Sequence, residues 1–326
     1  MQACPSLEFT RPVPIGSSLP LVIRPSRAGQ SMGDLAGERG LIEQGLRTVG
    51  GVLLRGFAVP TIEAFQAFAA SFGHPLLKYE FASTPRSAVS TSGVYTSTEY
   101  PAHQHIPLHN EQAYTREWPM KIWFHCVTAS PVGGETPIAD SRAIHRRMPV
   151  DILERFEPGL LYVRNYGDFD VPWQTVFNTD KRAEVEAFCR RSGIRWQWLS
   201  GGELRTEQVC QAVETHPVTG EKVWFNQAHL FHVSNLQPEV RESLEEIFGI
   251  ENVPRNVLHA DGSTIPDAVF DEIRAVLDAE TVSFRWEAGD VLMLDNMLVA
   301  HARSPFQGPR KVVVAMAESH GNLARF

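Results

Sequence analysis

Cysteine is scarce in this sequence, and no apolar run is long enough to span a membrane. The four cysteines among 326 residues are widely separated and form no C-x-x-C motif: Cys4, Cys126, Cys189 and Cys210. At this density, buried free thiols are a better interpretation than a disulfide framework. Residues 1–20 contain no apolar segment of signal-peptide length, and the apolar run 291–300 is short and interrupted by Asp295 and Asn296. We therefore expect a cytoplasmic protein.

Clusters of positive charge and nucleotide-binding glycine motifs are also missing. Lys and Arg total 30 against 38 Asp and Glu, a formal net charge of -8, with no block of like charges. A nucleic acid or an acidic membrane would need a basic patch, so neither is an expected partner. G-x-G-x-x-G and G-x-x-x-x-G-K-[ST] do not occur, which argues against a doubly wound nucleotide-binding sheet. Without internal repeats or low-complexity linkers, we expect a single domain, residues 1–326.

The sequence does contain short apolar segments that alternate with capped helical patterns. Strands are expected over seven segments: 50–57, 120–129, 160–166, 194–199, 281–286, 290–296 and 311–317. Helices are expected over four: 61–73, 179–193, 237–249 and 265–280. Their expected caps or first residues are Thr61, Thr179 or Asp180, Pro238 and Pro266. Strands near both ends thus frame a helix-rich middle, which predicts a mainly β protein with flanking helices (α+β) and a closed or double-sheet β core.

One short stretch, PLHNEQAYT (107–115), places His109 and Glu111 two residues apart. In a strand, residues i and i+2 point to the same face, so both side chains could aim at one metal ion. H-x-E alone is a weak signal, and a salt-bridged surface pair is the better interpretation of the motif taken by itself. A 2-His-1-carboxylate set that binds Fe(II) needs a second histidine.

His301 is the best-placed second histidine, because it follows the apolar run 291–300 and precedes a turn that contains Pro and Gly. Arg310 lies nine positions further, at the start of the next expected strand, and can bind a carboxylate through two hydrogen bonds. Thr136 follows the Gly133–Gly134 turn, and its hydroxyl can donate to the same carboxylate. The alternatives are a rim ion pair for Arg310 and a turn-stabilising role for Thr136.

Three segments carry a resemblance to a known family: PLHNEQAY (107–114), SPVGGETPIADSR (130–142) and DNMLVAHARSPFQGPRKVVVAM (295–316). They resemble the taurine dioxygenase/clavaminate synthase-like (TauD/TfdA) family of Fe(II)- and 2-oxoglutarate-dependent oxygenases. The resemblance implies a jelly-roll (double-stranded β-helix) core. It also implies that His109, Glu111 and His301 are the metal ligands, and that Thr136 and Arg310 hold the distal carboxylate of 2-oxoglutarate.

The resemblance also implies the reaction. O₂ and 2-oxoglutarate are consumed, succinate and CO₂ are released, and a hydroxyl replaces a hydrogen on an unactivated carbon. Halogenating relatives lack the carboxylate ligand so that chloride can bind iron, and Glu111 therefore favours hydroxylation, with desaturation as an alternative. Residues 164–177 and 216–232 resemble the syringomycin-type amino-acid hydroxylases of secondary metabolism. This subgroup implies an amino acid or related small carboxylate as substrate, either free or tethered to a peptidyl carrier protein.

Two functions of other classes stay open at this point. His₂Glu also suits a catalytic zinc ion, but a zinc hydrolase would leave Thr136 and Arg310 without a purpose. A non-catalytic binding module on the same fold is the other alternative. Among the remaining histidines, His103 and His105 would share a face with His109 if its strand extended that far, and we interpret them as packing or pocket-wall residues.

Residues that contact the substrate are the least defined part of the sequence. Arg164, Asn165 and Asn226 are the selected candidates, and three further residues are considered with them: Arg86, Gln174 and Arg303. The segment of about 167–280 lies between the two halves of the metal site in the chain. Because of this position, we expect it to form an insert that acts as a lid over the pocket.

Overall fold

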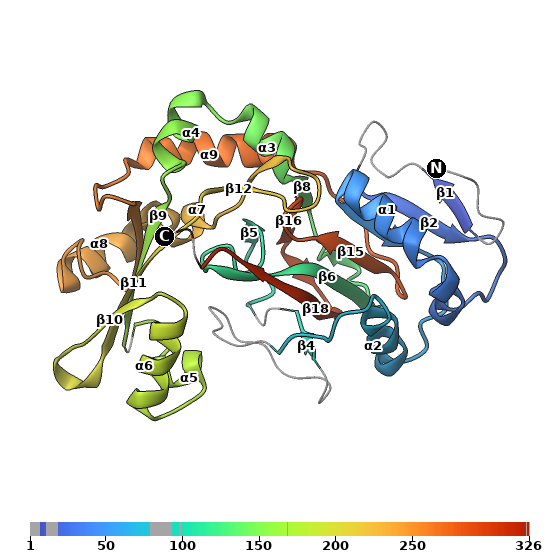
Figure 1. Ribbon diagram of the computed structural model, residues 1–326, viewed down its shortest axis with the longest axis horizontal. Helices are drawn as coiled ribbons and strands as arrows, with labels where there is room; N and C mark the ends of the chain where they lie inside the picture. Colours follow the sequence, from blue (N-terminus) through green and yellow to red (C-terminus); the bar gives the residue numbers. More distant parts are fainter. Residues whose placement is uncertain are drawn as a thin grey trace.

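The largest element of the computed structural model is a seven-stranded sheet (Figure 1). The structure describes residues 7–10, 19–78, 93–97, 100–167, 169–323 and 325. The strands of the sheet, in spatial order, are β1 (Leu7–Thr10), β2 (Leu21–Pro25), β3 (Gly51–Leu54), β15 (Val291–Asp295), β6 (Glu117–Thr128), β18 (Lys311–Gly321) and β4 (Val94–Thr96). Neighbours are antiparallel except β2 and β3, which are parallel.

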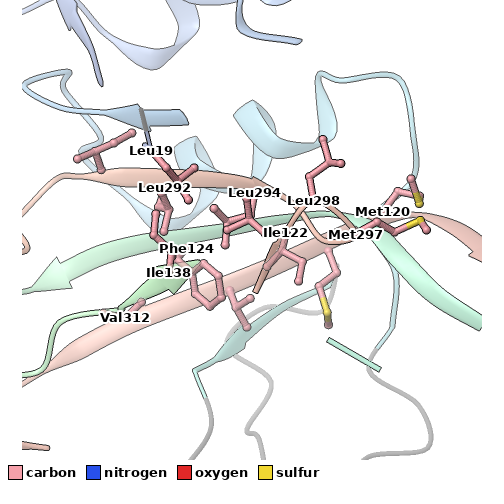
Figure 2. Packing of buried hydrophobic residues seen from close by; sticks show 14 of the residues in the cluster. Leu19, Met120, Ile122, Phe124, Ile138, Leu292, Leu294, Met297, Leu298 and Val312 are labelled. Carbon is pink, nitrogen blue, oxygen red and sulfur yellow. The ribbon is translucent and has the colours of Figure 1, made fainter. Parts of the chain in front are cut away.

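Each face of this sheet buries its own apolar cluster, because successive side chains of a strand point to opposite faces. Trp123 of β6 faces α1 (Arg39–Val49) and α2 (Ile62–Ala70), where it packs in a cluster with Ile42 and Phe65. Its neighbours Ile122 and Phe124 face the opposite cluster. Figure 2 shows this second cluster, in which residues of β6 and β15 pack with Ile138. The second cluster separates the large sheet from the strands that carry the candidate site.

A three-stranded sheet packs on that second cluster. Its order is β5 (Ile106–His109), β16 (Val299–Arg303) and β8 (Ile138–Asp140), and all pairs are antiparallel. Ile138 and Val299 belong to the buried cluster between the two sheets. Nearby, the two-residue strands β7 (Val132–Gly133) and β17 (Phe306–Gln307) pair with each other. Short strands from distant parts of the chain therefore meet around one small region.

Residues 141–280 build the remainder of the fold. A four-stranded sheet has the order β10 (Arg195–Trp198), β11 (Leu204–Cys210), β9 (Leu160–Tyr166) and β14 (Arg255–His259), and β12 (Val213–Thr215) pairs with β13 (Lys222–Trp224). In Figure 1, α3 (Ser141–Arg147), α4 (Val150–Phe156) and α9 (Asp267–Glu280) lie together on one side of the molecule. The other helices of this part are α5 (Trp173–Phe177), α6 (Arg182–Arg191), α7 (Ala228–Phe231) and α8 (Pro238–Phe248). The segment 167–280 thus contains strands as well as helices.

Most of the predicted elements are present, and the exceptions have local causes. Thr61 caps α2 by accepting a hydrogen bond from the backbone of Ala64. The predicted strand 281–286 is wrong, because Val282 makes only an isolated bridge to Ile138 and the following residues pair with no strand. The predicted cap of α6 is also displaced: Lys181 is its N-cap, and the Thr179 hydroxyl accepts from the Lys181 backbone instead.

The cysteines and the membrane-spanning potential of the helices can be compared with the expectations from the sequence. Cys126, Cys189 and Cys210 are free and buried, as expected, and Cys4 lies outside the part that the structure describes. Burial raises the pKa of the Cys126 thiol to about 11 and that of Cys189 to about 12, so both are neutral at pH 7. Among the described residues, no helix combines the length and the apolar character that crossing a bilayer requires.

Candidate metal centre and adjoining cavities

His109 and His301 are brought together by strand pairing. The two residues are direct partners in the antiparallel pair formed by β5 and β16. Directly opposed side chains of such a pair lie on the same face of the sheet, and the centroids of the two imidazole rings are 4.4 Å apart. Phe124 of β6 packs on the His301 ring from the large sheet, with 4.9 Å between ring centroids. His301 is buried at 4% exposure.

Glu111 reaches the same point from a turn. Strand β5 ends at His109, so the in-strand spacing invoked for His109 and Glu111 does not apply. Residues 111–114 form a turn in which Gln112 has a positive φ of 56°. One carboxylate oxygen of Glu111 lies 3.9 Å from Nε2 of His301. One ligand atom from each of His109, Glu111 and His301 lies within 4.8 Å of the others, a spacing that fits a shared metal ion.

Asn296 fixes the turn that carries Glu111. Its side-chain oxygen accepts from the Glu111 backbone N–H at 2.7 Å, and its amide donates to the carbonyls of Glu111 (2.9 Å) and Pro119 (2.8 Å). Asn110 donates to the Asn296 carbonyl at 2.6 Å and to the Ser141 hydroxyl at 3.1 Å. Asn296 is fully buried, so these groups have no competing water. This role of Asn296 was not predicted from the sequence, although a polar residue that interrupts an apolar run was the available signal.

We expect Asn296→Ala to weaken iron binding as well as stability. Its loss would break the hydrogen bonds that Asn296 makes with the buried N–H and carbonyl of Glu111, which costs about 1–3 kcal/mol. Groups that orient a metal ligand typically account for roughly 10–100-fold in metal affinity. Titration of Fe(II) under anaerobic conditions measures the second effect. Asn252→Ala is the control, because the exposed Asn252 side chain donates to the Phe248 carbonyl and does not contact the candidate ligands. Equal iron affinity in both variants would contradict the positioning role of Asn296.

The His109 imidazole is oriented by its own strand. Its Nδ1 lies 2.8 Å from the carbonyl oxygen of Pro107. A carbonyl can only accept, so Nδ1 carries the proton and Nε2 is left as the nitrogen that can bind a metal. Two of the three candidate ligands are thus held in place by hydrogen bonds. The His109 ring bonds the Pro107 carbonyl, and the backbone of Glu111 bonds the Asn296 side chain.

A small inner pocket adjoins His109 and His301 on the side of the large sheet. Thr136, Arg310, His109 and His301 are among the residues that line it, with Phe124 as part of its apolar wall. The Thr136 hydroxyl accepts a hydrogen bond from the Trp286 indole at 3.1 Å, which leaves its own hydrogen to donate elsewhere. The structure therefore brings the predicted hydroxyl and guanidinium to one pocket.

Arg310 is cationic in this pocket although it is largely buried. Burial, with a further contribution from the nearby Arg303, lowers the pKa of Arg310 to about 10, which still leaves it protonated at pH 7. Its Nε donates to the Gly134 carbonyl at 2.8 Å, and the side chain lies over the Phe306 ring. These contacts hold the guanidinium in one orientation. A carboxylate of matching shape would therefore bind with little loss of side-chain entropy.

The Gly133–Gly134 turn needs both glycines. Their φ angles are 67° and 77°, in the region that residues with a Cβ rarely occupy. A Cβ on Gly133 would lie 2.1 Å from the Pro305 carbonyl oxygen, and one on Gly134 would lie 2.9 Å from Cδ of Arg310. The turn therefore lets the backbone approach closely enough to contact Arg310 and to present Thr136.

A larger outer cavity opens beside His109 and Glu111. It shares Ile106 and His109 with the inner pocket, and Glu111 also lines it. Further lining residues come from the predicted lid segment: Gln227, Leu230, Phe231, Asn235, Leu236, Gln237, Val240 and Arg255. The candidate ligands thus border both spaces: His109 and His301 line the small basic pocket, and His109 and Glu111 line the larger, mixed cavity.

The three selected substrate candidates line neither of these cavities. Arg164 is buried at 3% exposure and contacts Asp170 and the Tyr166 ring. The Asn165 amide donates to the Val253 carbonyl. Asn226 accepts from the Ala228 backbone at the start of α7 and donates to the Ala212 carbonyl.

The remaining substrate candidates and the two histidines before β5 lie in different parts of the structure. Arg303 lines the inner pocket, and its guanidinium donates to three backbone carbonyls, of Tyr100, Pro101 and Gln104. Gln174 lies on α5, and Arg86 lies outside the described residues. His103 and His105 precede β5, so they do not share a strand face with His109, although His105 lines the outer cavity.

His229, in α7, is a buried neutral histidine. Its Nε2 donates to the Leu108 carbonyl at 2.7 Å, next to His109, and burial lowers its pKa to about 4. The unfolded chain, with an ordinary pKa of 6.5, therefore takes up a proton before the folded protein does. We expect the free energy of unfolding to fall as pH drops from about 6.5 towards 4, with His229 contributing about 3 kcal/mol at most. Urea unfolding between pH 7 and 4.5 measures this dependence.

His229→Gln keeps a hydrogen-bond donor but cannot titrate, so its stability should depend less on pH than that of the natural protein. His103→Gln removes an exposed imidazole and should leave the dependence unchanged. If His229→Gln retained the full acid-induced loss of stability, the assignment of that loss to His229 would be wrong.

Comparison with known proteins adds independent findings. The family described as "Taurine catabolism dioxygenase TauD, TfdA family" matches residues 27–316. The dapdiamide synthesis protein DdaC of Enterobacter agglomerans is 41% identical over 279 residues, which cover 85% of this chain and 84% of DdaC. A clavaminate synthase-like protein of Arabidopsis thaliana is 32% identical over 286 residues, 84% of this chain and 83% of the relative.

Solved structures share the fold at low identity. The crystal structure of PvcB from Pseudomonas aeruginosa has a TM-score of 0.58 at 17% identity, covering 97% of this chain and 92% of PvcB. A structure of AAD-2 in complex with Mn(II) and N-oxalylglycine has a TM-score of 0.56 at 13% identity, covering 97% and 98%. At such identities the likeness speaks for the mixed α/β fold alone. The family match and the two sequence relatives show that this chain belongs to the TauD, TfdA family and is an Fe(II)- and 2-oxoglutarate-dependent dioxygenase.

Proposed function

We propose that this dioxygenase hydroxylates an unactivated C–H bond of an amino acid or related small carboxylate in secondary metabolism. His109, Glu111 and His301 would bind Fe(II), and Thr136 and Arg310 would hold the distal carboxylate of 2-oxoglutarate. The observation that carries the proposal is the placement of two histidines and a carboxylate within 4.8 Å of one another, beside a pocket lined by Thr136 and Arg310. Imidazole and carboxylate ligands in this 2-His-1-carboxylate set are typical of non-haem Fe(II) oxygenases.

The chain's own residues would act by positioning and by excluding water. When bound, iron and 2-oxoglutarate supply the oxidation: one oxygen atom of O₂ enters succinate, the other enters the substrate as a hydroxyl, and CO₂ leaves. Arg310 and Thr136 would fix the far end of the cosubstrate from the inner pocket, with Phe124 and Val312 as apolar walls. The substrate would enter from the outer cavity, which His109 and Glu111 line.

We also propose how the sheets and the lid segment are organised. The seven-stranded sheet and the β5–β16–β8 sheet would be the two halves of a jelly-roll core in a single domain, residues 1–326. The segment of about 167–280 would be the lid. Its support is that eight residues of this segment line the outer cavity: Gln227, Leu230, Phe231, Asn235, Leu236, Gln237, Val240 and Arg255.

The assignment to secondary metabolism is supported by the relatives. DdaC is a dapdiamide synthesis protein, and a solved structure with a TM-score of 0.56 is described as an Fe, α-ketoglutarate dependent oxygenase from an isonitrile synthetic pathway. Both descriptions place the relative in the synthesis of a specialised metabolite. Delivery of the substrate by a peptidyl carrier protein and desaturation instead of hydroxylation are the variants of this proposal.

An anaerobic titration tests the proposal. The enzyme is mixed with Fe(II), and 2-oxoglutarate is then added without O₂. Chelation of iron by the keto acid should give a weak visible charge-transfer band, which zinc cannot give. Succinate release in air, with and without amino acids free or loaded on a carrier protein, then measures turnover. A protein that forms no band and binds zinc instead would be a hydrolase candidate, and one that forms the band but never releases succinate would be a binding module.

A further inference from the structure

Two arginines face each other directly across neighbouring strands beside the outer cavity. Arg164 of β9 and Arg255 of β14 are register partners in the four-stranded sheet. Like charges in directly opposed positions repel each other and destabilise a sheet. Such a pair therefore needs a negative charge close by, from the protein or from a ligand.

Asp170 supplies one negative charge to both arginines. Arg255 contacts both of its carboxylate oxygens, with 2.7 Å from Nε to Oδ2, and Arg164 contacts Oδ2 at 3.3 Å. Burial disfavours the ionised carboxylate, but the hydrogen bonds and charge of Arg255, together with Arg164, outweigh it and lower the pKa of Asp170. Asp170 is therefore ionised at pH 7 and pairs with both guanidinium groups.

The inner arginine is left with unsatisfied donors. Nε and Nη1 of Arg164 are buried and have no hydrogen-bond partner among the described residues. Its guanidinium lies over the Tyr166 ring, 4.5 Å from the centroid, which partly compensates the burial of its charge. Arg164 thus adds positive potential behind Arg255 from a position that solvent screens poorly.

Arg255 brings this positive charge to the outer cavity. Its side chain is 28% exposed and lines the same cavity as His109 and Glu111. It lies over the ring of Phe231, which also lines the cavity, and this contact restricts its movement. Among the described residues that line the cavity, Arg255 is the one arginine, no lysine is present, and Glu111 is the one carboxylate. Apolar side chains stand nearby, including Leu230 and Leu236.

We infer that Arg255, with Arg164 behind it, binds a free carboxylate of the substrate while an apolar part of that substrate lies against Leu230, Phe231 and Leu236. This inference rests on the proposed function and names the group by which the substrate is recognised. It also separates two forms of substrate. A monocarboxylic amino acid that is tethered to a carrier has its carboxyl group in the thioester and cannot form this ion pair, whereas a free acid, or a tethered molecule with a second carboxylate, can.

The test uses inert ligands at the metal site and simple acids as probes. The enzyme is loaded with Mn(II) and N-oxalylglycine, an analogue of 2-oxoglutarate, and its melting temperature is followed during titration with straight-chain acids from acetate to hexanoate. The corresponding primary amides serve as neutral matched probes, at constant ionic strength. The acids should half-saturate at concentrations at least about tenfold lower than the amides, since a charge-assisted contact contributes more than 1.4 kcal/mol. The half-saturating concentration of the acids should fall as their chains lengthen, because longer chains contact more of the apolar surface of Leu230, Phe231 and Leu236.

Three variants locate the effect. Arg255→Gln should remove the difference between acids and amides, and Arg255→Lys should keep part of it because the charge remains. Arg205→Gln is the control, because Arg205 is a similarly exposed, ion-paired arginine of the same sheet that does not line the cavity. Acids that stabilise the natural protein no better than amides, or a difference that survives in Arg255→Gln, would overturn the inference.

The anaerobic Fe(II) and 2-oxoglutarate titration separates this inference from the proposed function. Natural enzyme and Arg255→Gln should form the same charge-transfer band at the same 2-oxoglutarate concentration, because Arg310 holds the cosubstrate. A missing band in the natural enzyme would overturn the proposed function while the acid titration still decided the role of Arg255. A band lost only in Arg255→Gln would show that Arg255 serves the cosubstrate instead, which would also overturn the inference.

Discussion

Replacing His301 by alanine is expected to abolish iron-dependent turnover while leaving the fold largely intact. The ring is one of three candidate ligands, and its loss leaves His109 and Glu111, too few protein ligands to hold Fe(II) against water and buffer. His301 is buried between Phe124 and His109, so its truncation also leaves a small cavity and a modest loss of stability. Anaerobic Fe(II) titration, succinate release and circular dichroism measure the three effects separately.

A second buried histidine provides the control for that experiment. His259 is 6% exposed and packs edge-on against Phe156, and its strand β14 belongs to a different sheet from β5 and β16, which carry His109 and His301. His259→Ala should lose stability to a similar degree but retain iron binding and turnover. Unchanged turnover in His301→Ala would remove this residue from the metal site, and equal losses in both variants would mean that the activity reports stability alone.

Replacing Arg310 by leucine is expected to raise the 2-oxoglutarate requirement far more than it changes iron affinity. The guanidinium is buried, cationic at pH 7 and held by the Gly134 carbonyl beside Thr136. Loss of a charge-assisted contact with a carboxylate in such a pocket costs roughly 2–4 kcal/mol, about 30–1000-fold in apparent affinity. The dependence of succinate formation on 2-oxoglutarate gives this ratio, and Fe(II) titration without 2-oxoglutarate gives the iron affinity.

Arg310→Lys and Arg205→Gln complete that experiment. The lysine keeps the charge without the two-pronged geometry and should give an intermediate requirement. Arg205→Gln changes an arginine outside both cavities and should have the natural requirement. If Arg310→Leu kept an unaltered cosubstrate dependence, another cation would hold the acid, and Arg303 would be the first to examine because it lines the same pocket.

The sequence by itself determined the elements whose signals are local. The cap of α2 at Thr61, the proline that begins α8, and strand β9 over Leu160–Tyr166 follow from residue types at fixed short spacings. The expected strand 281–286 did not form, although its composition suits a strand, because pairing partners come from the tertiary structure and not from local preference. The two glycines before Thr136 were visible as a turn, and their positive φ angles explain why the turn needs them.

Only the tertiary structure decided which of the polar residues share a site. His109 and Glu111 were paired in the sequence by an in-strand spacing, but the structure joins them through a turn that the buried Asn296 holds from almost 200 positions away. Arg255 carried no sequence signal, and it became a candidate only because β14 pairs with β9 and turns its guanidinium to the outer cavity. The physical reason is the distance along the chain over which each interaction acts. Caps and turns depend on backbone preferences over a few residues, whereas strand pairing between distant segments sets which charges meet, and where water is excluded from them.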